Sequence, residues 1–299
     1  MVAPQRKKTA AIRAGVGGWV FAPWRGTFYP KDLPQARELE YASRQLTSIE
    51  INGTFYGSQK PASFRRWHAE TPEDFVFSLK GPRFATHRRE LGEARESVER
   101  FFASGVLELG DKLGPVLWQF PGTKRFEPDD FAAFLQLLPA SIEGRSIRHV
   151  VEVSHQSFAE PAFIDLLRAH RVALALVDAE DRPSVFDLTA DFVYARLRRS
   201  MEGEPTGYPV PALDAWAKRF KAWAAGGEPS DLPRIHAGPA PAAKARDCFV
   251  YFISGAKVRA PAAAQALIER LARPSERSGQ AGRARARGSN ADAKRRRAP

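Results

Sequence analysis

Short apolar runs rich in β-branched and aromatic residues alternate along this chain with longer stretches in which apolar positions recur with a helical period. This alternation is typical of βα units, in which helices join parallel strands. Eight of the apolar runs have the length and boundaries of strands. We predict strands at residues 12–17, 48–51, 75–79, 116–120, 149–153, 172–177, 192–197 and 249–252.

The stretches between these strands, and the one after the last strand, have helical patterns. In one of them Trp216, Phe220 and Trp223 recur at spacings of four and three, as the inward face of a helix requires. The interval after the sixth strand offers only a poor helix. We predict helices at residues 35–44, 62–70, 93–109, 129–138, 162–170, 211–225 and 261–271.

Eight strands linked by crossovers close naturally into a barrel. We therefore predict an α/β fold of the (β/α)₈ class, with a single domain over residues 11–272. An open, doubly wound sheet built from the same elements is the alternative. Residues 226–246 are rich in Gly, Pro and Ala and predict a long insert before the eighth strand.

The charge of the chain is concentrated at its two ends. The formal net charge is +12, and residues 1–10 contribute three basic residues with no acid. Residues 273–299 hold nine basic against two acidic residues, which leaves about +2 for the body. This last segment has no aliphatic residue larger than alanine and no aromatic one, so we predict a disordered, Arg-rich tail behind the barrel and a basic arm in front of it.

The cysteine content and the hydropathy of the chain indicate in which cellular compartment the protein lies. The single cysteine, Cys248, excludes an internal disulfide and suits a reducing environment. No stretch approaches the roughly 18 to 20 uncharged apolar residues of a membrane span, and the charged first twenty residues do not have the pattern of a signal peptide. We predict a cytoplasmic protein with no membrane contact.

Several segments carry a resemblance to a known family. They are GVGGWVFAPWRGTFYP at 15–30, IEINGTFYGSQKPASFRRW at 49–67, FVFSLKGPRFATH at 75–87, LGDKLGPVLWQFP at 109–121 and HVVEVSHQSF at 149–158. In this order and spacing they resemble the DUF72 family of YecE-like proteins, and the resemblance continues to about residue 271. It implies a TIM-barrel-like fold, distantly similar to the xylose isomerase and endonuclease IV barrels. It implies no settled activity.

The chain also departs from the pattern of that family. The family has asparagines after the eighth strand, whereas residues 252–263 of this chain read FISGAKVRAPAA. After the seventh strand the family often has His, and this chain has Arg198. These departures indicate that a function carried by the rim of strands seven and eight is modified or lost.

Candidate site residues follow from the fold class, because catalytic groups of such barrels lie at the carboxyl ends of the strands. We predict that Glu50, Lys80, Glu152 and His155 are catalytic, with the carboxylates and His155 as proton-transfer groups. We predict that the substrate is bound by Trp19, Asn52, Tyr56, Gln119, Asp178 and Arg196.

Other interpretations of the same residues stay open. Glu50 and Glu152 lie inside apolar strands, so Lys80 or Arg196 can neutralise them as a purely structural network. The side chains of Glu50, Glu152, His155 and Asp178 are also of the types that ligate divalent metals. Because they come from separate strands with no shared local motif, we assign no metal ligand and leave a divalent metal open as the cofactor.

Three functions are compatible with these patterns. The first is an enzyme of hydrolase or isomerase type, acting on a small polar or phosphorylated substrate at the carboxyl end of the barrel. The second is a nucleic-acid-associated protein, either a barrel like endonuclease IV or a nonspecific binder that uses the basic residues of 273–299. The third is a scaffold that has lost its chemistry.

Overall fold

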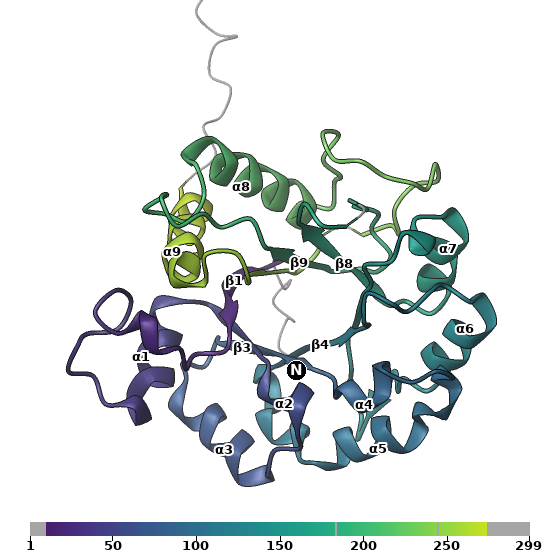
Figure 1. Cartoon of the computed structure of the whole chain (residues 1–299), viewed down its shortest axis with the longest axis horizontal. Helices are drawn as coiled ribbons and strands as arrows, with labels where there is room; N and C mark the ends of the chain where they lie inside the picture. The colour runs from purple at the N-terminus through teal and green to yellow at the C-terminus, as the bar shows by residue number, and fades with distance from the viewer. Residues whose placement is uncertain (1–9, 183, 244, 274–299) are drawn as a thin grey trace, which may run out of the picture.

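The computed structural model describes residues 10–182, 184–243 and 245–273. Eight parallel strands form a closed barrel in the order β1-β10-β9-β8-β7-β4-β3-β2 (Figure 1), which confirms the predicted fold class. The predicted strands match the observed ones to within a few residues. The barrel strands are β1 (Ile12–Gly17), β2 (Ser48–Ile51), β3 (Val76–Lys80), β4 (Leu113–Gln119), β7 (His149–Glu152), β8 (Ala173–Asp178), β9 (Val193–Leu197) and β10 (Cys248–Phe252).

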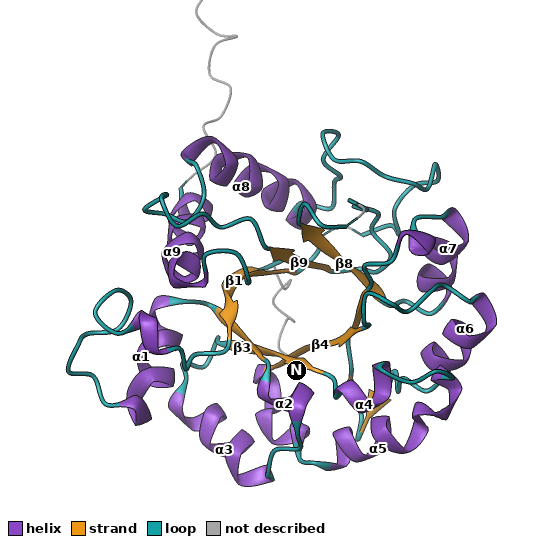
Figure 2. Ribbon diagram, in the orientation of Figure 1, coloured by secondary structure: helices purple, strands orange, loops and turns teal. Residues whose placement is uncertain are grey.

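Helices surround this ring of strands (Figure 2), and a two-stranded ribbon, β5 (Ser141–Ile142) and β6 (Arg145–Ser146), precedes β7. Two short helices, α2 (Gly53–Tyr56) and α4 (Arg83–Thr86), follow β2 and β3 at the carboxyl end of the barrel. The other α-helices are α1 (Glu38–Gln45), α3 (Pro61–Glu70), α5 (Arg95–Ala103), α6 (Pro128–Gln136), α7 (Pro161–Ala169), α8 (Val210–Ala224) and α9 (Ala260–Ala272).

One predicted helix is divided in the structure. The sequence predicted a continuous helix over 93–109, whereas α5 ends at Ala103 and a 3₁₀ segment runs from Val106 to Lys112. Gly105 lies between them with φ of 100°, a left-handed conformation that glycine adopts without strain. A Cβ at this position would lie 2.8 Å from atoms of Pro61 in α3. The helix therefore ends at a left-handed glycine, at a position where the close approach of α3 leaves no room for a side chain.

The connection from β8 to β9 has no helix in its described part, and the insert predicted at 226–246 packs against this connection. The backbone N–H of Phe186 donates to the carbonyl of Pro233, and the carboxylate of Asp187 accepts from the N–H groups of residues 235 and 236. His236 also lies 2.9 Å from a carboxylate oxygen of Asp165 in α7. The insert, seen between α7 and α8 in Figure 1, thus covers the side of the barrel that the missing helix leaves open.

The interior of the barrel changes from apolar to charged toward the carboxyl ends of the strands. Alternate residues of each strand point inward. Leu117, Val150 and Phe249 belong to the apolar cluster of the interior. Above them the hydroxyl of Tyr251 hydrogen-bonds with the hydroxyls of Ser48 and Ser78, at 2.7 and 2.6 Å. The last inward position of several strands is polar or charged: Glu50, Lys80, Gln119, Glu152 and Arg196.

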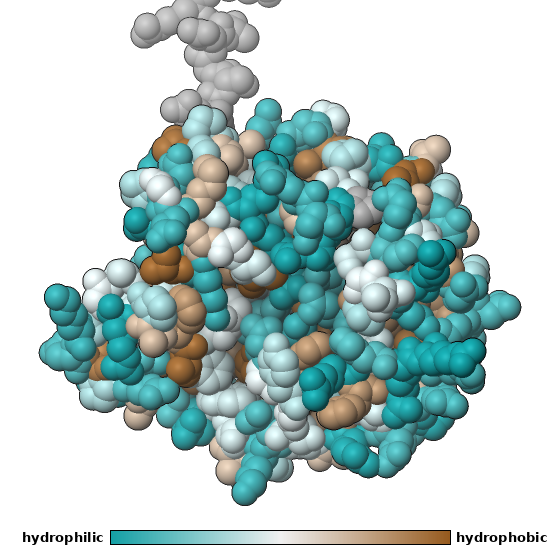
Figure 3. Space-filling view, viewed as in Figure 1, coloured by the Kyte–Doolittle hydropathy of each residue, from teal (hydrophilic) through white to brown (hydrophobic). Residues whose placement is uncertain are grey.

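The predicted arm and tail lie almost wholly outside the described residues, since residues 1–9 and 274–299 are not described. In the part of the chain that the structure describes, no helix is long and apolar enough to cross a membrane. On the face seen down the barrel, hydrophilic residues gather around the centre (Figure 3).

Candidate functional site

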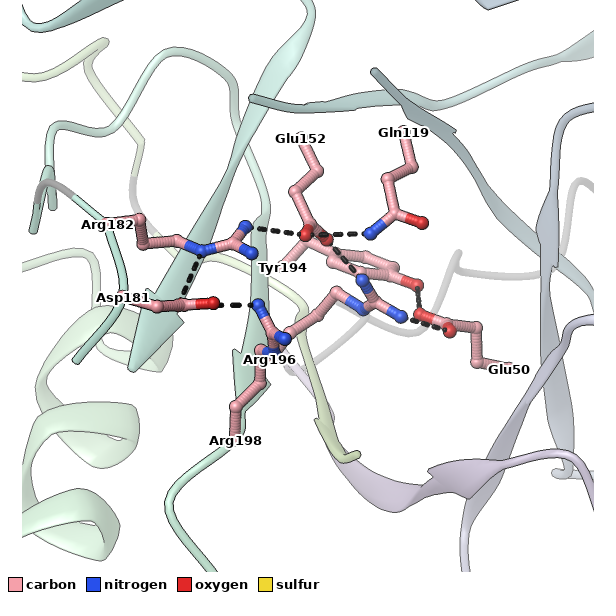
Figure 4. A network of polar contacts seen from close by, with 8 residues as sticks. All are labelled: Glu50, Gln119, Glu152, Asp181, Arg182, Tyr194, Arg196 and Arg198. Carbon is pink, nitrogen blue, oxygen red and sulfur yellow. Dashed lines mark hydrogen bonds and ion pairs between the residues drawn. The ribbon is translucent and has the colours of Figure 1, made fainter. Parts of the chain in front are cut away.

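Arg196 of β9 links two buried glutamates at the carboxyl end of the barrel (Figure 4). Its Nη2 donates to Oε1 of Glu50 at 2.9 Å, and its Nη1 donates to Oε2 of Glu152. The hydroxyl of Tyr194 donates to the other oxygen of Glu50 at 2.6 Å. All four side chains are buried. One guanidinium thus bridges carboxylates from β2 and β7, which are separated by β3 and β4 in the barrel.

Glu152 is held in its charged form. Besides Arg196, its carboxylate accepts from Nη1 of Arg182 and from Nε2 of Gln119, both at 2.9 Å. Burial alone would raise the pKa of Glu152, but the ion pairs with Arg196 and Arg182 outweigh it and lower the pKa to about 2. A carboxylate that stays ionised at neutral pH is a poor proton donor. These contacts favour the structural-network interpretation of Glu152, and its catalytic role stays a prediction.

Lys80, the last residue of β3, carries the most perturbed amine of the site. Its Nζ lies 3.9 Å from the centre of the Phe55 ring, and its side chain is almost fully buried. Burial and then repulsion from Arg196 lower the pKa of Lys80 to about 8, although Glu50 and Glu152 oppose the shift. With that pKa, roughly a tenth of the amine is uncharged at pH 7. Lys80 therefore combines a cation with a small population of free base.

A cavity of about 310 Å³, here called the mouth cavity, opens above this network. Two buried guanidinium atoms on its wall, Nε of Arg196 and Nη1 of Arg198, have no hydrogen-bond partner among the described residues. Nη1 of Arg198 also lies 3.7 Å from a carboxylate oxygen of Asp181. The polar residues that line the cavity are neutral or basic: Asn52, Lys80, Gln119, Arg182, Arg196, Arg198, Ser254 and Lys257.

The structure brings together six of the residues predicted for the site. Glu50 and Glu152 lie in the buried network, and the mouth cavity is lined by Asn52, Lys80, Gln119 and Arg196. The assigned roles of these residues stay predictions.

Two other predicted residues lie away from the mouth cavity. The ring of His155 caps a 3₁₀ turn, with its Nδ1 accepting from the backbone N–H of Ser157 at 3.1 Å. Asp178 lies in a different depression, where its carboxylate is 3.4 Å from the hydroxyl of Tyr208. The prediction placed these side chains with the other site residues, and the structure does not.

The two predicted aromatic residues also lie elsewhere. Trp19 packs edge-on against Trp67 of α3, with ring centres 5.3 Å apart, and belongs to the periphery of the hydrophobic core. Tyr56 is 66% exposed and touches Phe55 rather than the cavity. In this structure Phe55 is the aromatic residue that contacts the amine of Lys80.

The sequence-based site omitted several cationic and polar residues of the cavity wall. Arg182 lies in the loop after β8. The sequence of this loop has no clear helical pattern, so it did not show which of its residues return to the barrel. Arg198, Ser254 and Lys257 lie in the two segments where the chain departs from the family pattern. The altered positions after the seventh and eighth strands thus form part of the mouth cavity. Their position after a predicted strand was the signal that could have included them.

A second depression, here called the side groove, lies between the ends of β8 and β9 and helix α8. Its volume is about 850 Å³, and it shares Arg198 and Ser254 with the mouth cavity. Its charged groups are mostly paired at the surface: Arg199 lies 2.8 Å from Glu180, and Arg219 lies 2.9 Å from Asp231. Among the described residues, no group of three or more His, Cys, Asp or Glu side chains is arranged to hold a metal ion.

A closed parallel barrel with surrounding helices, and with polar side chains at the carboxyl ends of its strands, defines a protein of the TIM-barrel class. The model of a family described as "Protein of unknown function DUF72" matches residues 13–287. The chain therefore belongs to the DUF72 family, which confirms the resemblance seen in its sequence.

Known relatives agree with this assignment. The UPF0759 protein YunF of Bacillus subtilis is 28% identical over 115 residues, which span 37% of this chain and 40% of YunF. A DUF72 family protein from Thermotoga maritima superimposes with a TM-score of 0.67 at 20% identity, over 87% of this chain and 99% of that one. A DUF72 family protein from Enterococcus faecalis gives 0.64 at 16% identity, over 89% and 99%. At these identities the structures show the fold.

Proposed function

We propose that this protein is an enzyme of hydrolase or isomerase type that acts on a small anionic substrate, phosphorylated or carboxylated, in the mouth cavity. The observation that carries the proposal is Lys80, a buried amine with a pKa lowered to about 8 in a cavity whose charged wall residues are all basic. Perturbed amines that adjoin a cavity are typical of catalytic sites.

The contacts support a separate proposed role for each charged residue of the cavity. Arg182, Arg198 and Lys257 bind the anionic group of the substrate, because guanidinium and ammonium groups match phosphate and carboxylate oxygens. Arg196 is fixed in place by its hydrogen bonds to Glu50 and Glu152, so its positive charge keeps a constant position in the site. The free-base form of Lys80 then supplies the reactive lone pair of the site.

The test begins with the anion. Thermal unfolding of the protein is followed in the presence of inorganic phosphate, sulfate, small sugar phosphates and small carboxylic acids, and compounds that raise the melting temperature are assayed for conversion by NMR. We expect turnover to be lost in Lys80→Met, with the fold kept, and to persist in the side-groove variant Arg219→Met. Absence of stabilisation by every anion, or full turnover in Lys80→Met, would contradict the proposal.

A nucleic-acid role remains a separate prediction, and it rests on the sequence of the tail. The nine basic residues of 273–299 would contact phosphates without reading bases, and such binding weakens steeply with salt. A chain ending at Leu271 is expected to lose most affinity for duplex DNA while keeping its ligand stabilisation. Equal DNA affinity of the full and shortened chains would remove the tail as an argument.

A further inference from the structure

The surroundings of Lys80 distinguish it from an ordinary salt-bridged lysine. The carbonyl of Lys80 accepts from Oγ1 of Thr54 at 2.7 Å, which anchors the end of β3 to α2. The same helix places the ring of Phe55 beneath the amine. Among the described residues, no carboxylate lies within ion-pair distance of Nζ, because Arg196 engages both Glu50 and Glu152. The amine therefore faces an apolar ring and a neighbouring cation.

Such surroundings favour nucleophilic chemistry by an amine. Lysines become nucleophilic when they are desolvated in an apolar pocket or placed beside another cation, because both conditions increase the uncharged form. Lys80 meets both conditions, because its side chain is buried and because Arg196 is a neighbouring cation. The group that an uncharged amine attacks most readily is the carbonyl of an aldehyde or ketone.

We propose that Lys80 forms an imine with its substrate, which makes the substrate a small aldehyde or ketone that also carries a phosphate or carboxylate. The inference rests on the proposed anion-binding function of the mouth cavity. The lone pair of Nζ forms a bond to the carbonyl carbon. The carbonyl oxygen leaves with the two amine hydrogens as water, and a carbon–nitrogen double bond remains.

The geometry of the cavity fits this class of substrate. Its volume of about 310 Å³ is at the small end of the range of ligand pockets, roughly 300 to 1,000 Å³. Arg198 and Lys257 lie on its wall to bind the anionic group, and the amides of Asn52 and Gln119 can hydrogen-bond to hydroxyls. A protonated imine withdraws electrons from the adjacent carbon, so Lys80 would assist removal of a proton or breakage of a bond at that carbon.

Lys257 provides an internal control within the same cavity. Its Nζ lies 4.4 Å from the centre of the Phe21 ring, so it also contacts an aromatic face. Burial lowers its pKa, but no neighbouring arginine adds to the shift. If the cation beside the amine matters, Lys80 will react with carbonyl compounds in preference to Lys257.

The experiment traps the imine on the full-length protein. The protein is incubated near pH 8 with glycolaldehyde phosphate in one arm and pyruvate in the other, reduced with sodium borohydride, and mapped by peptide mass spectrometry. We expect Lys80 to carry the reduced adduct at least about tenfold more than Lys257. Inorganic phosphate is expected to compete with the reaction. The uncharged probe acetaldehyde should label Lys80 weakly, because it lacks the anionic group.

Two variants separate reactivity from folding. Lys80→Arg keeps the positive charge but cannot form the imine, so its adduct at position 80 is lost while phosphate still raises the melting temperature. Arg219→Met, which changes the side groove only, keeps the adduct on Lys80. The arm that labels Lys80 more strongly identifies the anionic group as phosphate or carboxylate.

The outcomes distinguish this inference from the proposed function. If neither anionic probe labels Lys80 above Lys257 while phosphate still stabilises the protein, the imine inference is wrong and the anion-binding site stands. If phosphate gives no stabilisation, the proposed function itself fails. Labelling of Lys80 that phosphate does not reduce would also overturn the inference, because the anionic group would then play no part in binding.

Discussion

The mouth cavity and the side groove are neighbours that differ in how their charges are balanced. The side groove is the larger, at about 850 against 310 Å³. Its arginine Arg199 is 52% exposed and pairs with the exposed carboxylate of Glu180. In the mouth cavity the side chain of Arg196 is 6% exposed, and cations outnumber the carboxylates behind them. The comparison teaches that buried, unbalanced charge, rather than volume, distinguishes the mouth cavity as the candidate site.

The largest expected effect is on folding, from Arg196→Met. Removal of this guanidinium leaves Glu50 and Glu152 buried without their shared cation, and breaking a buried ion pair typically costs about 3–5 kcal/mol. Denaturant unfolding at pH 7 measures the loss. The matched control is Arg199→Met in the side groove, where an exposed pair contributes about 1 kcal/mol or less. Equal losses in the two variants would contradict the distinction between the two regions.

The strand residues of the mouth cavity were predictable because they follow the alternation of the strands, whereas Arg182, Arg198, Ser254 and Lys257 lie in loops beyond it. In β8, Ala173, Ala175 and Val177 face the interior, so Asp178 falls on the opposite side and reaches the side groove. The prediction grouped all polar residues at strand ends without applying this alternation. Because side chains alternate along each strand, Glu50 and Lys80 lie at the mouth and Asp178 does not.

Other features depended on contacts between distant segments. The side groove is partly walled by Leu232 and Pro233 of the insert, whose low-complexity sequence gave no sign of where it packs. The division of α5 from the following 3₁₀ segment required the close approach of Pro61 to Gly105. A period of hydrophobic residues does not encode such tertiary contacts. The strands and most of the helices were therefore predicted accurately, whereas the break in one helix and the packing of the insert were not.

The second prediction concerns the pH dependence of stability caused by Lys80. Its folded pKa of about 8 lies below the unfolded value near 10.4, so between these pH values the unfolded chain binds more protons. Raising the pH through this window therefore stabilises the folded protein, by up to about 3 kcal/mol relative to Lys80→Met. Unfolding curves of both proteins at pH 7, 8, 9 and 10 measure the difference. A constant difference over this range would show that the lysine has an ordinary pKa.

A smaller effect is expected on phosphate affinity. Lys80→Met removes one cation from the mouth cavity, and we expect phosphate to bind roughly tenfold more weakly, equivalent to about 1.4 kcal/mol. Arg219→Met removes a cation from the side groove, where Asp231 already neutralises it, and should leave the affinity unchanged. Isothermal titration calorimetry at constant ionic strength measures both. Weaker binding only in Arg219→Met would place the anion in the side groove instead.

The smallest expected effect comes from Tyr208→Phe in the side groove. The buried hydroxyl of Tyr208 accepts from the backbone N–H of Arg199 at 2.7 Å and lies 3.4 Å from Asp178, while its ring packs on Phe252. The substitution keeps the ring and removes two hydrogen bonds, of which the one to Asp178 is long, so we expect a loss of about 1 kcal/mol in the free energy of unfolding.

Phosphate affinity should stay within about twofold of the unmodified protein, because the hydroxyl of Tyr208 does not line the mouth cavity. This variant is the most sensitive probe of whether the two regions act separately, since they share Arg198 and Ser254. A tenfold loss of phosphate affinity in Tyr208→Phe would mean that the loop after β9 transmits changes from the groove to the cavity. The two depressions would then have to be treated as one site, with the substrate extending past Arg198 into the side groove.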